Sequence, residues 1–137
     1  GGAQLRALQR VRPLHRVYAY DREPGLAERF AADLSAELAL DVRPVTELRP
    51  ATRESDVVVT CTPSRAPILG TADVRPGTFV AAVGADHPDK QEIDPALLAA
   101  ATIVAADEPV DQLPASSAGK LPITERLPPD ETGFEPR

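Results

Sequence analysis

Cysteine, methionine and tryptophan are almost absent from this sequence, which has one cysteine, Cys61, and none of the other two. A single cysteine excludes a disulfide within the chain and is typical of a protein kept in a reducing compartment. Aromatic residues make up only 4% of the 137 residues. The core must therefore be built from Ala, Val, Leu and Ile, which favours helices packed on a sheet over an aromatic binding platform.

Positive charge is also in short supply. The chain has 15 Lys and Arg against 21 Asp and Glu, which gives a net charge of -6 and a pI near 4.9. Such a chain repels phosphate backbones and anionic lipids, so we expect neither nucleic acid nor a membrane surface as a partner. The sequence shows no signal-peptide pattern and no apolar run long enough to cross a bilayer. We therefore expect a cytoplasmic protein.

The most regular apolar segment is Phe-Val-Ala-Ala-Val at residues 79–83, which ends at Gly84. An unbroken run of this kind is typical of a parallel strand buried on both faces. Residues 56–62, Asp-Val-Val-Val-Thr-Cys-Thr, predict a second such strand. We expect further strands at residues 16–20, 41–46 and 102–106. Pro44 lacks a backbone N–H, so its strand belongs at a sheet edge.

Helical patterns alternate with these strands. Leucine and valine recur every three positions over residues 3–11, and an apolar residue recurs every four positions from Leu26 to Leu38, just after Pro24. Asp94-Pro95 has the order of an N-cap followed by a first-turn proline and predicts a third helix. Residues 47–55 predict a turn or short helix. This alternation predicts an α/β fold with a doubly wound parallel sheet.

The start of a dinucleotide-binding fold is missing. Such a fold begins with a strand, a G-x-G-x-x-G loop and a helix, whereas this sequence opens on Gly-Gly-Ala-Gln at residues 1–4. We expect a Rossmann-like sheet without its first strand and glycine loop, in a piece of a longer protein. Another segment or chain must then pair with the strands beside the gap. We assign this domain to residues 1–108 and interpret the proline-rich residues 109–137 as an irregular arm.

Two charged residues follow Gly84, at the position where open α/β sheets bind ligands. Asp86 could accept a proton from an amine or orient a water for attack on an imine. Lys90 could neutralise a phosphate, or pair with Asp86 or Glu92. The alternative is that these residues form an exposed, salt-bridged turn.

Other strand ends supply candidate cofactor contacts. Asp21 could accept both hydrogen bonds of an adenosine ribose, and it would repel the 2′-phosphate of NADP and so favour NAD. Adjacent Arg22 could weaken this preference. The alternative for Asp21 is a cap on the following helix. Thr62 could bond a ribose or phosphate, or could simply end its strand in a turn with Pro63 and Ser64.

Cysteine and histidine offer little chemistry. Cys61 has no base or metal-ligand spacing around it, so we interpret it as a small buried hydrophobic residue. His15 and His87 have no clustered partners, and we expect no metal site.

Taken together, these segments resemble the ornithine cyclodeaminase, mu-crystallin and archaeal-type alanine dehydrogenase family. The longest matching stretch is Val-Gly-Ala-Asp-His-Pro-Asp-Lys-Gln-Glu at residues 83–92. The order and spacing of the other matching stretches make the resemblance specific; these are residues 7–13, 17–22, 56–64 and 76–78.

The resemblance implies a Rossmann domain that binds NAD or NADP and acts on an amino acid or a cyclic imine. It implies cofactor contacts by Asp21, Arg22, Thr62, Ala82, Val83 and Lys90, and a catalytic role for Asp86 beside the substrate amine. Two features depart from the family pattern. Only Gly-Ala-Gln at residues 2–4 corresponds to the glycine loop, and nothing corresponds to the domain that grips the substrate carboxylate, so this chain alone should lack a complete active site.

Two functions therefore remain open at this stage. The first is the nucleotide-binding portion of an NAD(P)-dependent cyclodeaminase, amino-acid dehydrogenase or ketimine reductase. The alternative is a non-catalytic binding or assembly module derived from the same fold.

Overall fold

The computed structural model describes residues 1–102, which contain two pairs of parallel strands. The first pair is β1 (Val17–Tyr20) with β2 (Val42–Val45), and the second is β3 (Val57–Thr60) with β4 (Phe79–Ala82). The helices are α1 (Gly2–Val11), α2 (Pro24–Leu38), α3 (Leu48–Glu54), the short 3₁₀ helix η1 (Thr71–Asp73) and α4 (Pro95–Ala100). The strand expected at residues 102–106 and the arm at 109–137 fall essentially outside the described residues.

Local sequence explains where two of the helices begin and end. Pro24 occupies the first position of α2, where the missing N–H costs nothing, and the helix ends at Ala39 in a left-handed conformation with φ of 52°. The side chain of Asp94 accepts a hydrogen bond from the Ala96 N–H at the start of α4, as its position before Pro95 predicts. Residues 48–54 form a helix, α3, in the polar segment for which a turn or short helix was expected.

Each strand pair has its own hydrophobic core. Around β1 and β2, the side chains of α1 and α2 are buried with those of the strands; this core consists of Leu5, Ala19, Ala31, Leu34 and Val42. The core around β3 is smaller and contains Val58, Leu69 and Ile93. Leu69 and Ile93 also form an isolated parallel bridge, which joins the loops that follow β3 and β4.

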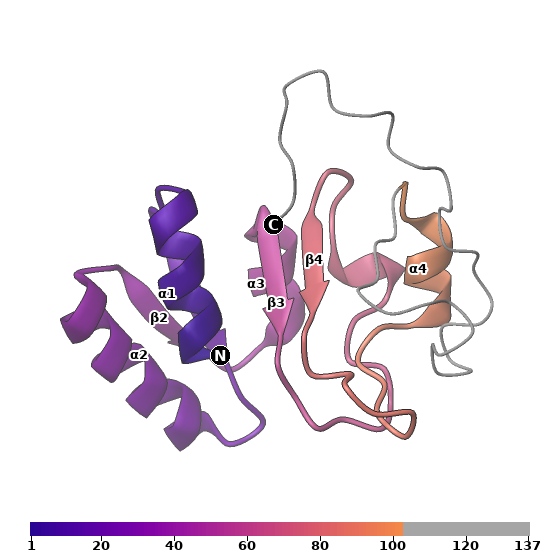
Figure 1. Ribbon diagram of the computed structural model, residues 1–137, viewed down its shortest axis with the longest axis horizontal. Helices are drawn as coiled ribbons and strands as arrows, with labels where there is room; N and C mark the ends of the chain where they lie inside the picture. The colour runs from indigo at the N-terminus through magenta and orange to yellow at the C-terminus, as the bar shows by residue number, and fades with distance from the viewer. Residues whose placement is uncertain (103–137) are drawn as a thin grey trace, which may run out of the picture.

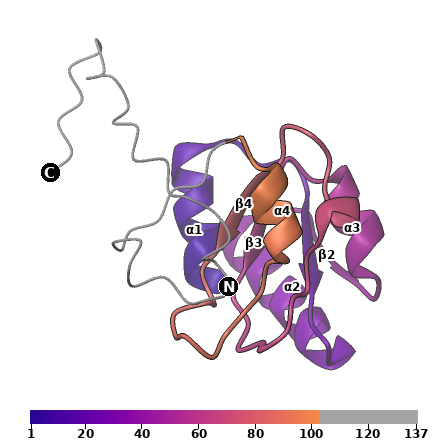
Figure 2. The same cartoon turned by 90° about the vertical axis from the view of Figure 1, so that its right-hand side faces the viewer.

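No strand pairing joins β1 to β3 among residues 1–102. Figure 1 shows α1, α2 and β2 in one half of the molecule and β3, β4 and α4 in the other. Viewed at 90° to this, α1 and α3 lie on opposite sides of β3 and β4 (Figure 2). Helices on both faces of parallel strands identify the α/β, Rossmann-like class. Within the described part of the chain, residues 1–102, β1 and β3 each pair with one neighbouring strand only.

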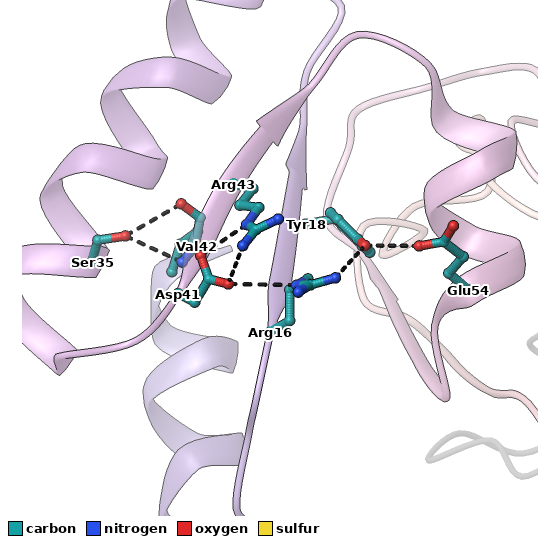
Figure 3. Close-up of polar contacts among 7 residues, drawn as sticks. All are labelled: Arg16, Tyr18, Ser35, Asp41, Val42, Arg43 and Glu54. Atoms are coloured by element: carbon teal, nitrogen blue, oxygen red, sulfur yellow. Dashed lines mark hydrogen bonds and ion pairs between the residues drawn. The ribbon is translucent and has the colours of Figure 1, made fainter.

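Side chains connect the two halves where the backbone does not (Figure 3). The Tyr18 hydroxyl on β1 donates a 2.8 Å hydrogen bond to Glu54 at the end of α3. Beside it, Asp41 accepts hydrogen bonds from the guanidinium groups of Arg43 and Arg16, at 2.9 and 3.4 Å. The bond from Arg43, with its positive charge, lowers the pKa of the Asp41 carboxyl. The charged groups here are exposed, so their ion pairs add little stability.

Candidate functional site

An open cleft of about 340 Å³ lies where β3 and β4 end beside the N-terminus of α1. In Figure 1 the arrowheads of both strands and the chain's N-terminus lie at the same, lower edge. Three short segments line this cleft: Gly1 and Gln4 of the α1 start, Cys61, Thr62 and Pro63 after β3, and Val83, Gly84, Asp86 and Lys90 after β4. The structure thus brings four of the sequence-predicted site residues together: Thr62, Val83, Asp86 and Lys90.

Asp86 and Lys90 form an ion pair at the rim of this cleft. The Lys90 ammonium lies 2.5 Å from one oxygen of the Asp86 carboxylate. The Asp86 side chain is 70% exposed and that of Lys90 is 31% exposed. The hydrogen bond from Lys90, reinforced by its positive charge, lowers the pKa of Asp86. The salt-bridged turn that was the alternative for these residues is therefore present, and it coexists with a place for Asp86 on the cleft wall.

Glu92 is the residue that sequence reasoning missed. It was considered only as a partner for Lys90, but its side chain is buried, at 1% exposure, beneath the cleft. Its Oε1 accepts the Thr62 N–H at 2.6 Å, and its Oε2 accepts the Thr60 hydroxyl at 2.7 Å and the Gly84 N–H at 2.9 Å. No local pattern in the sequence marked this burial, because the Thr60 and Thr62 donors lie 32 and 30 positions away from Glu92.

Thr62 forms a turn at the end of its strand, which was the alternative to a cofactor contact. Its hydroxyl accepts the Ser64 N–H at 3.3 Å, while its backbone N–H is bound by Glu92. The residue nevertheless lies on the cleft wall. The interpretation of Cys61 as a buried hydrophobic residue was wrong: the thiol is exposed and lines the cleft, because β3 ends at Thr60 and the chain turns outward there.

The remaining predicted cofactor residues lie outside the lining of this cleft. Asp21 follows β1, and its Oδ1 accepts the backbone N–H of Glu23 at 2.9 Å. The N-cap of α2 is Glu23, so Asp21 stabilises the turn before the helix and is not its cap residue. Arg22 is exposed in the same turn, and Ala82 is exposed at the end of β4.

Residues 1–102 contain no group of three or more His, Cys, Asp or Glu side chains arranged to hold a metal ion. Within the same residues no helix is long and apolar enough to cross a membrane.

Parallel strands covered by helices on both faces, with polar groups gathered at the strand ends, define an α/β domain of the Rossmann-like class. The chain belongs to the ornithine cyclodeaminase/mu-crystallin family, whose model matches residues 2–118. The family resemblance seen in the sequence is therefore confirmed.

Named relatives and solved structures are similar to about three quarters of this chain. It is 41% identical to the alanine dehydrogenase of Archaeoglobus fulgidus over 105 residues, which cover 76% of this chain and 31% of that protein. An archaeal alanine dehydrogenase dimer with bound NAD superposes with a TM-score of 0.69 and 38% identity, covering 76% of this chain and 32% of that one.

The iminosuccinate reductase of Paracoccus denitrificans in complex with NAD⁺ superposes with a TM-score of 0.68 and 39% identity. That match covers 74% of this chain and 31% of the reductase chain. The chain thus spans about a third of the length of the relatives it matches.

Proposed function

We propose that this chain is the nucleotide-binding portion of an NAD(P)-dependent oxidoreductase that acts on an amino acid or a cyclic imine. The reaction would be a cyclodeamination, an oxidative deamination or a ketimine reduction. The observation that carries this proposal is the cleft itself, because it joins the ends of two parallel strands, the start of a helix and an ionised carboxylate. The NAD complexes of two structural relatives support the choice of cofactor.

The residues around the cleft suit a nicotinamide dinucleotide. The N-terminus of α1 carries a partial positive charge and unpaired N–H groups, which favour a pyrophosphate. Val83 is 46% exposed and offers an apolar surface for a planar ring. We assign cofactor contacts to Thr62, Ala82, Val83 and Lys90, and assign Asp21 and Arg22 to the adenosine ribose. Asp21 favours NAD, and NADP is the alternative. When bound, the cofactor supplies hydride transfer.

We assign the catalytic role to Asp86. Lys90 lowers the pKa of this carboxyl, so at neutral pH it is a carboxylate that can hold a substrate ammonium. We assign it the proton-accepting role as well, although the lowered pKa makes it a weaker base. Its exposure leaves it open to a ligand in the cleft.

Other parts of the protein must complete this site. Among the described residues β1 and β3 each pair on one side only, and the cleft is open. We infer that a further strand between them and a further domain supply the missing backbone partners and the residues that bind the substrate carboxylate. We expect the assembled enzyme in the cytoplasm.

A thermal-shift titration tests the proposal. A ligand that binds only the folded state at 100 times its Kd stabilises that state by about 2.7 kcal/mol. We expect millimolar NAD to raise the Tm of the folded protein, and NADP to raise it less. A folded protein whose Tm responds to neither nucleotide contradicts the cofactor role.

Among residues 1–102, β1 and β3 each have one edge without a strand partner, which favours one second candidate, a non-catalytic binding or assembly module. Such a module would add a strand from a partner without binding nucleotide. It predicts no response in the same titration, together with a folded state that depends on a partner chain.

A further inference from the structure

The Glu92 carboxylate joins the carboxyl ends of two neighbouring strands. Three groups donate to it: the Thr60 hydroxyl and the Thr62 N–H at the end of β3, and the Gly84 N–H at the end of β4. We call this arrangement the Glu92 clasp. Each of the two carboxylate oxygens is used, and all three recorded donors are neutral.

A buried carboxylate bonded to neutral donors is costly for stability, so its presence calls for a reason. Both oxygens must accept hydrogen bonds here, which glutamine cannot reproduce because its amide has one acceptor oxygen and two N–H donors. An N–H donor of the strand ends would then face an amide N–H. A carboxylate, with two acceptor oxygens, therefore suits the three donors at the two strand ends better than an amide does.

The same residue fixes the loop that carries Asp86 and Lys90. That loop leaves the sheet at Gly84, whose N–H the Glu92 side chain binds. It returns at Glu92, whose backbone oxygen accepts the N–H groups of Ile68 and Leu69 at 2.8 and 3.1 Å. Both ends of the loop are thus held by one residue.

Gly84 makes the clasp possible. A Cβ at this position would lie 2.3 Å from the Thr62 oxygen, 2.4 Å from the Thr62 nitrogen and 2.5 Å from Glu92 Oε1. Only glycine therefore lets the two strand ends approach a common carboxylate.

We infer that Glu92 is a positioning residue that sets the separation between Thr62 on one wall of the cleft and the Asp86 loop on the other. The inference rests on the proposed function of the cleft. Glu92 lies beneath the cleft lining and acts through its neighbours, because its oxygens are all bound within the protein.

The test compares Glu92→Gln and Thr60→Val with wild type, in the protein at its full natural length. Thr60→Val removes one hydroxyl donor at nearly constant shape, and Thr60→Ser restores it. The control is Glu28→Gln, which changes an exposed glutamate of α2. The readouts are the NAD Kd, kcat and KM for an amino-acid substrate, and amide hydrogen exchange at Thr62 and Gly84.

For Glu92→Gln we expect at least tenfold faster exchange at Thr62 and Gly84, a tenfold weaker NAD Kd and a tenfold lower kcat. Thr60→Val should show smaller changes in the same direction, and Thr60→Ser should match wild type. A purely structural role would lower Tm and leave kcat and Kd of the folded enzyme within twofold of wild type, which would overturn the inference. Glu28→Gln should leave the exchange rates, the NAD Kd, kcat and KM unchanged.

The exchange measurement separates this inference from the proposed function. If wild type binds no NAD, the proposed function fails, while the Thr62 and Gly84 amides still report the clasp. Unchanged exchange in Glu92→Gln and Thr60→Val overturns the clasp whatever the cofactor result. Thr60→Val also keeps the test valid if Glu92→Gln does not fold.

Discussion

The ammonium of Lys90 lies 2.5 Å from the carboxylate of Asp86 on the wall of the cleft. The two residues are four positions apart in a loop, so the pairing depends on how the loop folds back after Gly84. The contact keeps Asp86 ionised and holds its side chain beside the ends of β3 and β4. Four predictions follow from this site and its supports.

Replacing Asp86 by asparagine should remove turnover and spare cofactor binding. The amide keeps the shape of the side chain but cannot take a proton, and general acid–base catalysis contributes about 10²- to 10⁴-fold. We expect kcat to fall at least about 100-fold, with an NAD Kd close to that of wild type. Asp89→Asn is the matched control, because Asp89 is equally exposed in the same loop. Unchanged turnover in Asp86→Asn would remove this residue from the mechanism.

Replacing Lys90 by methionine should raise the pKa of Asp86. The lysine favours the ionised carboxyl by a hydrogen bond and by its charge, so without it the pKa should return toward the ordinary value of 3.8. The carboxylate form is present above this pKa and lost as pH falls through it, so the loss should begin at a higher pH in Lys90→Met. NMR titration of the Asp86 carboxyl carbon measures the midpoint directly. Identical midpoints in the two proteins would show that the pair does not form in solution.

Replacing Asp21 by serine should weaken the preference for NAD. Serine can still accept the Glu23 N–H, so the turn before α2 is kept, while the charge that repels a 2′-phosphate is lost. We expect NAD to bind about 10-fold more weakly, as for loss of a hydrogen bond to a charged group. The ratio of NADP to NAD affinity should rise. Asp33→Ser, an exposed change on α2, controls for net charge. An unchanged ratio would leave Asp21 with its structural role alone.

Replacing Gly84 by alanine should destabilise the fold. The added Cβ would meet backbone atoms of Thr62 at 2.3 and 2.4 Å, and neither strand end can move without breaking its pairing. Overpacking of this kind costs about 1–3 kcal/mol in the free energy of unfolding. Gly25→Ala is the control, since its Cβ would meet nothing within 4 Å, and we expect a gain of about 0.5 kcal/mol. Urea unfolding measures both, and equal stability of the two variants would refute the close approach at Gly84.

Local patterns in the sequence were enough to predict most helices and strands and the edge at which the cleft lies. The apolar runs of β3 and β4, the four-residue spacing in α2 and the Asp94-Pro95 cap depend on neighbours within one turn or strand. Open α/β sheets bind ligands at the ends of their strands, so the position of Asp86 at this edge could be predicted from its place after Gly84. The strand expected at residues 102–106 stays a prediction.

Only the tertiary structure decided what each side chain does at that edge. Glu92 is buried beneath the cleft, and Cys61, which was expected to be buried, is exposed in it. Thr60 and Glu92 are 32 positions apart, and their contact exists because β3 and β4 pair in parallel. The sequence by itself determined a Rossmann-like sheet and the edge that holds the site. The burial of a charge depends on donors brought from distant segments, which no local pattern encodes.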